Sequence, residues 1–222
     1  MKTAKGRMKN AKWKILTFAI CSVHFAILVS GCASFRVAGE IQQGRRALLR
    51  GEPEAALPHF QRAAQLDPTY LAYVSPLTEG VWTYTGRAYY DMKQFPEARK
   101  ALEQALSRTE HDHFARLYLG LILGRDGDRQ RGLRQTETAL EGFHGLLDDN
   151  YHPDARFWDS TGELRSVIRK QLASISGKEV NWPELISTGE WLGQQLEEEI
   201  DLSARLKQLE ETRDSDNESP AP

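Results

Sequence analysis

The chain has almost no cysteine. Its two cysteines, Cys21 and Cys32, both lie within the first 32 of its 222 residues. The sequence after Cys32 therefore carries neither a disulfide nor a thiolate metal site. It also lacks the compact motifs of common catalysts, namely a phosphate-binding glycine-rich loop, a Gly-x-Ser-x-Gly elbow and a His-Glu-x-x-His zinc helix. We therefore expect no catalytic residue, no cofactor and no bound metal.

Acidic residues are absent from the segment before Cys32. All six charges of that segment are basic, and without them 23 basic residues remain against 31 acidic ones. The rest of the chain thus has a formal net charge of −8. Binding to nucleic acid needs a basic surface that attracts phosphates, so this acidic balance argues against a nucleic-acid partner.

The first 31 residues have the composition of a secretory leader. The basic stretch from Lys2 to Lys14 is followed by sixteen residues without Asp, Glu, Lys or Arg, Ile15 to Ser30. Sixteen residues are short for a bilayer-spanning helix, which needs about 20, but they suit the core of a signal peptide. The long basic stretch also allows Met8 to be the true start. We predict a cleaved signal peptide over residues 1–31; an uncleaved anchor is the alternative.

The leader ends in Leu28-Val29-Ser30-Gly31-Cys32. This segment resembles the lipobox of bacterial lipoproteins, and the resemblance implies that Cys32 becomes the acylated first residue, palmitate being one such acyl group. Acyl chains contribute about 0.8 kcal/mol per buried methylene to membrane attachment. Ala33 stands where an inner-membrane retention signal has Asp, so the resemblance implies the periplasmic face of the outer membrane. Residues 32–37 would form a short lipidated linker.

Small residues recur at fixed intervals in the centre of the chain. Three columns of Gly or Ala repeat in three copies; the second and third copies are 34 residues apart, and the first two are 42 apart in every column. Within each copy twelve residues separate the first column from the second, which places the two on consecutive antiparallel helices. Only a hydrogen atom or a methyl group fits where two helices cross closely, so this pattern predicts tight helical hairpins. The columns are Gly44, Gly86 and Gly120; Ala56, Ala98 and Gly132; Ala63, Ala105 and Ala139.

These residues resemble the tetratricopeptide repeat, a helical hairpin of 34 residues. The second copy adds Trp82 and Tyr89, whereas the third is degenerate, with Thr136 where a bulky residue is usual. The resemblance implies an all-α solenoid of about three hairpins over residues 38–147, divided near 38–70, 79–112 and 113–147. A helical hairpin array outside this family is the alternative.

The segments around the repeats also carry predictions. The eight extra residues at about 71–78 are expected to lengthen a loop. Residues 148–211 are expected to form capping helices: Ser160 and Glu163 match a capping box, and Leu192, Leu196, Ile200 and Leu206 form one stripe of a last helix. That stripe is expected to fold back onto the repeats. The composition of residues 212–222 predicts a disordered tail.

In the resembled family, ligand contacts come from fixed positions on the first helix of each pair, which lines a concave face. The resemblance carries this role to Ile41, Arg45, Leu48, Thr83, Arg87, Tyr90, Asp91, Leu117, Leu121 and Arg125. Three of these residues are arginines, and they would form a basic row suited to a peptide with an acidic group or a carboxylate. The alternative is that the arginines are solvated or paired within the chain.

Two polar clusters are weaker candidates for chemistry. His111 and His113 could chelate a metal, but their place between two helix pairs is also typical of a solvated turn. The cluster Asp148, Asp149, Asn150, His152 and Asp154 does not match a calcium loop. We therefore hypothesise a membrane-anchored periplasmic scaffold that binds a protein or peptide of an envelope complex. The alternatives are a regulator of peptidoglycan synthesis or a peptidoglycan-acting enzyme, whose carboxylates would include Asp159 and Glu163.

Overall fold

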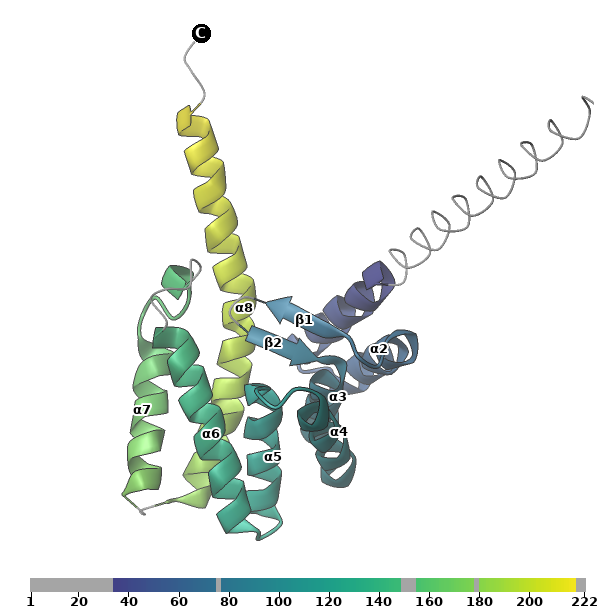
Figure 1. Ribbon diagram of the computed structural model, residues 1–222, viewed down its shortest axis with the longest axis vertical. Coiled ribbons are helices and arrows are strands. Elements are labelled where there is room, and N and C mark those ends of the chain that lie inside the picture. The colour runs from purple at the N-terminus through teal and green to yellow at the C-terminus, as the bar shows by residue number, and fades with distance from the viewer. Residues whose placement is uncertain (1–33, 75–76, 149–154, 178–179, 219–222) are drawn as a thin grey trace, which may run out of the picture.

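The computed structural model describes residues 34–74, 77–148, 155–177 and 180–218 (Figure 1). The predicted signal peptide, Cys32 and most of the polar cluster at 148–154 lie outside these residues. Among the described residues, no helix is both long and apolar enough to cross a membrane.

Three helical hairpins form the first part of the molecule. Residues 34–49 pair with α2 (Pro53–Leu66), α3 (Val81–Asp91) with α4 (Phe95–Arg108), and α5 (His113–Arg125) with α6 (Arg129–Asp148). Proline occupies the first turn of both α2 and α4, where its missing N–H leaves no hydrogen bond unmade. The predicted all-α solenoid of about three hairpins with C-terminal helices is thus confirmed.

The small-residue columns lie where the helices cross. A Cβ atom added at Gly86 would lie 2.6 Å from the Cγ atom of Leu102. At Gly120 the obstacle is backbone, since an added Cβ would lie 2.8 Å from the amide nitrogen of Thr136 on α6. Gly44 is likewise covered by the ring of Phe60. Small size at these positions therefore lets each first helix approach its partner.

The eight extra residues between the first two hairpins include two strands, which the sequence had predicted as loop. Strands β1 (Leu71–Val74) and β2 (Leu77–Gly80) pair in antiparallel register. Gly80 at the end of β2 is also the N-cap residue of α3. The hairpin therefore leads directly into the second repeat and carries the buried Glu79 to the start of α3.

The capping region is helical but begins differently from the prediction. Helix α7 (Glu163–Ser176) follows the short 3-10 helix η1 (Ala155–Phe157). Its first amides are satisfied by Asp159, whose carboxylate accepts hydrogen bonds from the backbone of Leu164 and Arg165 at 2.9 and 3.0 Å. The predicted capping box from Ser160 is therefore wrong, because the amide of Glu163 donates to the Thr161 hydroxyl and the buried Asp159 accepts from the next two amides.

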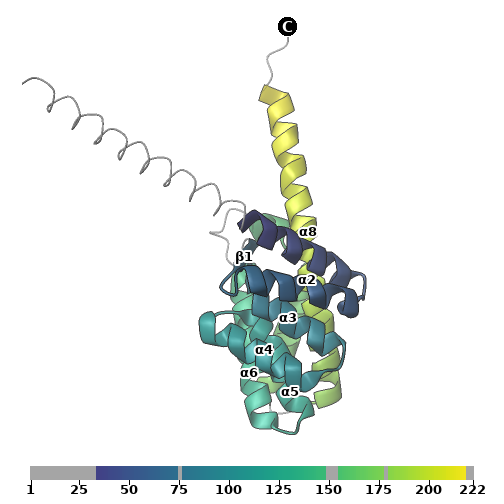
Figure 2. The same ribbon diagram turned by 90° about the vertical axis from the view of Figure 1, so that its right-hand side faces the viewer.

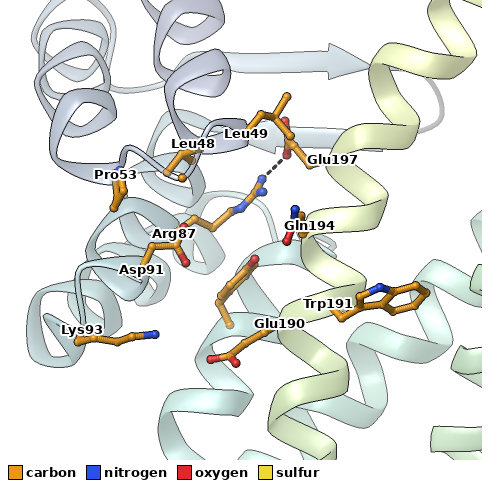
Figure 3. A pocket seen from close by; sticks show the side chains of 12 residues that line it. Leu48, Leu49, Pro53, Arg87, Asp91, Lys93, Glu190, Trp191, Gln194 and Glu197 are labelled. Carbon is orange, nitrogen blue, oxygen red and sulfur yellow. Dashed lines mark hydrogen bonds and ion pairs between the residues drawn. The ribbon is translucent and has the colours of Figure 1, made fainter.

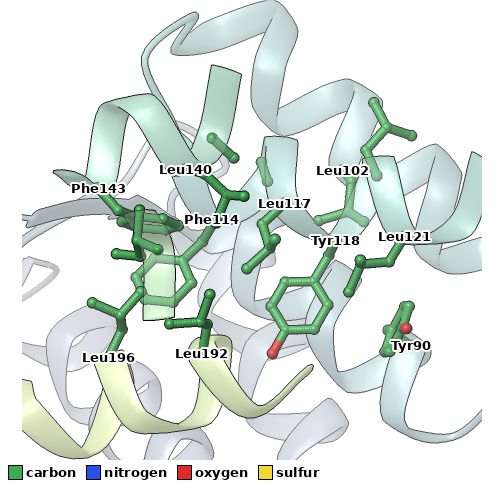
Figure 4. Close-up of a cluster of buried hydrophobic side chains, with 14 of the residues drawn as sticks. Tyr90, Leu102, Phe114, Leu117, Tyr118, Leu121, Leu140, Phe143, Leu192 and Leu196 are labelled. Carbon is green, nitrogen blue, oxygen red and sulfur yellow. The ribbon is translucent and has the colours of Figure 1, made fainter. Parts of the chain in front are cut away.

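The last helix is the longest element. Helix α8 (Trp182–Glu218) runs past the ends of α5 and α7, and its C-terminal part extends beyond the rest of the fold (Figures 1 and 2). The prediction of a disordered tail from residue 212 differs from the structure, since the chain stays helical to Glu218. As expected, the apolar stripe of α8 packs against the repeats: Leu192, Leu196 and Ile200 join the core formed by α5 and α6 (Figure 4).

Candidate functional site: the groove between the repeats and helix α8

The arginines of the predicted basic row face helix α8. Arg45 and Arg87 come from the first helices of the first two repeats and are only 3% and 4% exposed. Both donate to the carboxylate of Glu197 on α8 (Figure 3 shows the Arg87 contact). Arg125 from the third repeat pairs with Glu190 at a distance of 2.7 Å. Glu190 lies seven residues, or two helical turns, before Glu197 on α8. The acidic group expected from a partner peptide is thus supplied by the chain itself.

Glu197 stands at the centre of a buried ion cluster. Arg87 also donates to Glu79 at 2.8 Å, and Arg45 reaches Asp201 at 3.3 Å. Burial alone would raise the pKa of Glu197, but the charges of Arg87 and Arg45 outweigh burial and lower it. Burial, with Glu197 close by, raises the pKa of Glu79 well above 4.5. Glu197 is therefore the carboxylate that holds both guanidinium groups.

The other predicted contact residues are also largely enclosed. Thr83 donates to Asp112, the N-cap residue of α5, and Tyr90 donates to Glu190 at 2.8 Å. Leu121 is fully buried against Gly189 of α8. These three side chains are buried, Tyr90 and Leu121 against α8 and Thr83 against the start of α5, so none of them lies on an open surface in this structure.

Tight packing fixes α8 in this position. Two glycines on its inner face allow the approach: an added Cβ at Gly189 would lie 2.8 Å from Leu121, and one at Gly193 would lie 2.9 Å from the Cζ atom of Tyr118. The helix contributes Leu185, Leu192, Leu196 and Ile200 to the largest buried cluster of the described residues. Helix α8 is thus part of the hydrophobic core and covers most of the concave face.

One part of the concave face stays open. A cavity of about 500 Å³ lies between α8 and the first two repeats, a size typical of ligand pockets. We call it the groove cavity. Its wall includes three residues of the predicted contact set: Leu48, Arg87 and Asp91. Lys93 stands at its rim, and Glu190, Gln194 and Glu197 of α8 form the opposite side (Figure 3). Tyr118 of α5 also lines the cavity.

Asp91 is the unpaired charge of the groove cavity. Its carboxylate has neither a hydrogen bond nor an ion pair with any residue that the structure describes. The side chain is open to solvent, yet it stands in a concavity with protein around it, and this desolvation raises the pKa of Asp91 above 3.8. Arg87 and Lys93 attract this carboxylate at longer range, so the groove cavity presents a negative group that has nearby cations but no ion pair.

The remaining candidates have structural roles or stay untested. Asp159 is 2% exposed, caps α7 and pairs with Arg165 at 3.1 Å, whereas Glu163 is exposed. The structure therefore gives this carboxylate pair no shared cleft. The ring of His113 packs against Gly142 and Phe143, and burial lowers its pKa. No group of three metal-ligating side chains occurs among the described residues.

The sequence interpretation missed the acidic half of the site. Glu190, Glu197 and Asp201 are spaced by seven and four residues, so they lie on one stripe of α8. That spacing was visible in the sequence and could have been matched to the three arginines. The remaining member, Glu79, gives no such signal, because its burial depends on the strand pair at 71–80.

Comparison with known proteins identifies the repeat. Residues 80–112 match the sequence profile of the tetratricopeptide repeat, and this range runs from the N-cap of α3 through α4 to the N-cap of α5. A search of curated proteins finds no match. The chain therefore contains a tetratricopeptide repeat, set in an all-α solenoid whose concave face is covered by its own last helix.

Proposed function

We propose that this protein is a lipid-anchored scaffold at the periplasmic face of the outer membrane, where it binds a protein subunit of an envelope assembly. A tetratricopeptide repeat indicates a protein-interaction scaffold. The observation that carries the proposal is the groove cavity, an open, polar recess on the concave side of the repeats. The leader ending at Cys32 supports the anchor and the compartment.

The anchor is tested on Cys32. In cells given globomycin, which blocks lipoprotein signal peptidase, the uncleaved precursor should accumulate. Cys32→Ser should leave the protein without acyl chains, as measured by mass spectrometry of the intact chain, whereas Cys21→Ser should be acylated normally because it lies within the leader. Normal acylation of the Cys32→Ser variant would refute the lipoprotein assignment.

The partner surface is tested by photocrosslinking in cells. A benzoylphenylalanine at Lys93 would sit at the rim of the groove cavity, and one at Arg134, an exposed residue of α6, serves as the control. The proposal expects an adduct with an envelope protein at position 93 and none at position 134. Equal adducts at the two positions, or none at position 93, would contradict binding through this groove.

Replacing the three arginines together would not test this surface. Arg45 and Arg87 neutralise Glu197 inside the protein, so their loss would leave a buried carboxylate without a counter-ion. Such a variant is expected to unfold, and any loss of partner binding would then follow from the loss of structure. The rim residues Leu48 and Lys93 are better positions because both retain solvent exposure.

A further inference from the structure

The charges that line the groove cavity do not balance. Two basic side chains, Arg87 and Lys93, face three acidic ones, Asp91, Glu190 and Glu197. Glu197 is shared by Arg45 and Arg87, and Glu190 is held by Arg125. Asp91 is the acid without an ion pair, although Arg87 and Lys93 attract it at longer range. The helix α8 has thus reversed the charge preference of the concave face, from the basic row expected from the sequence to an unpaired carboxylate.

Asp91 stands where a negative charge is least favourable for the fold. It is the last residue of α3, and the backbone dipole of a helix places partial negative charge at that end. Desolvation in the groove adds a second cost, as its raised pKa records. No cation within the described residues forms an ion pair with it. A residue that is unfavourable for folding in two ways is better explained by a ligand than by stability.

Arg87, the basic neighbour of Asp91 on α3, is held inside the protein. The Nε–H of Arg87 makes no hydrogen bond, although the Arg87 side chain is 95% buried and its Nη1 atom serves Glu79 and Glu197. The guanidinium lies over the rings of Phe114 and Tyr118, so this N–H is enclosed by the protein and does not form part of the open surface of the groove cavity. Arg87 and Asp91 are four residues apart on α3, so they lie on the same helix face.

We propose that the groove cavity accepts a lysine or arginine side chain of the partner protein, with Asp91 as its counter-ion. This inference rests on the proposed function, since it names the chemistry of the same surface. Leu48, Leu49 and Pro53 offer apolar contacts to the methylene stem of a long basic side chain. A charge-assisted hydrogen bond then fixes the cationic group.

The test compares three peptides that differ in one residue. Acetylated and amidated pentapeptides carry arginine, its neutral isostere citrulline, or glutamate between pairs of alanines. Their dissociation constants for the immobilised full-length chain in detergent are measured by surface plasmon resonance. A hydrogen bond to a charged group contributes about 1.5–3 kcal/mol, so the arginine peptide should bind roughly tenfold or more tightly than the other two.

Variants of Asp91 assign the preference to this residue. Asp91→Asn should remove the difference between the arginine and citrulline peptides, and Asp91→Lys should invert the order in favour of glutamate. Glu141→Gln, which neutralises an exposed acid on α6 that has no polar contact among the described residues, should leave the preference unchanged. The melting temperature of Asp91→Asn should be equal to or above that of the wild type, whereas a merely structural role would lower it.

The outcomes separate this inference from the proposed function. Equal binding of the arginine and citrulline peptides, binding of none of the three, or a preference that survives Asp91→Asn would each overturn the inference. The crosslinks at position 93 and the acylation of Cys32 would be unaffected by such results. Conversely, a chain that selects arginine through Asp91 but forms no envelope adduct would retain the groove chemistry and refute the proposed scaffold.

Discussion

Replacing Glu197 with glutamine is the sharpest test of how α8 is held. Glu197 is 1% exposed and contacts both Arg45 and Arg87. Glutamine has the same shape, so the change opens no cavity, but it leaves two buried guanidinium groups short of one negative charge. Removing one partner of a buried ion pair costs about 3–5 kcal/mol. We therefore expect the free energy of unfolding to fall by that amount.

The assay is urea unfolding followed by circular dichroism, with Glu198→Gln as the matched control. The control makes the same chemical change one residue later on α8, at a side chain that is exposed. Substitutions at such surface positions usually change the free energy of unfolding by no more than about 0.5 kcal/mol. In thermal unfolding the Glu197 variant should melt roughly 6–20 °C below the wild type, since each kcal/mol moves the midpoint of a chain of this size by about 2–4 °C. Equal stability of the two variants would refute the ion-cluster argument.

The same difference should depend on pH. The folded pKa of Glu197 lies below 4.5 because the charges of Arg87 and Arg45 outweigh the effect of burial. An acid with a lowered folded pKa contributes stability above its ordinary pKa and loses it as the pH falls through the folded value. The gap between wild type and Glu197→Gln should therefore be full at about pH 7 and shrink below about pH 4.5. A gap that persists unchanged at about pH 3 would contradict the assigned cause.

Four further substitutions, which make three predictions, have expected effects on thermal unfolding. Gly120→Ala should lower stability more than Gly86→Ala, because the added methyl lies 2.8 and 2.9 Å from backbone atoms of α6 at Gly120, whereas at Gly86 its closest contacts are with the Leu102 side chain and the nearest backbone atom is 3.3 Å away. Overpacking costs about 1–3 kcal/mol, and equal losses would contradict the difference. Asp159→Ala should cost about 0.5–2 kcal/mol because it removes the cap of α7, and an unchanged melting curve would dismiss that cap. Tyr84→Phe should be neutral or stabilising, since the buried Tyr84 hydroxyl has no hydrogen-bond partner among the described residues; a clear loss would show that the hydroxyl is satisfied.

The repeat could be predicted from sequence because its signal is local and periodic. Close crossings demand small residues at set intervals, so Gly86 and Ala98 mark one hairpin without knowledge of any other part of the chain. The strand pair at 71–80 could not be predicted in the same way. Its strands are only four residues long, and Pro76 within the segment favoured a loop.

The place of α8 was only half predictable. Its apolar stripe showed that it would pack on the repeats, yet the partners of Arg45 and Arg87 lie 152 and 110 residues away in the sequence. Charge pairs at such separations leave no periodic mark within either segment. The basic row was therefore assigned to an outside peptide, although the acidic stripe of α8 has the complementary charge and spacing.

A short solenoid has a reason to cover its own concave face. Three hairpins are about the minimum for a stable stack, and the inner wall of this one includes apolar residues such as Leu117 and Leu121, both fully buried under α8. Without α8 these residues and the two arginines would face water, and the last hairpin would lack a cap. The helix that stabilises the stack thus also decides which charges remain available. It neutralises the arginines and leaves Asp91 without an ion pair, so the partner preference that we propose would follow from the same packing that completes the core.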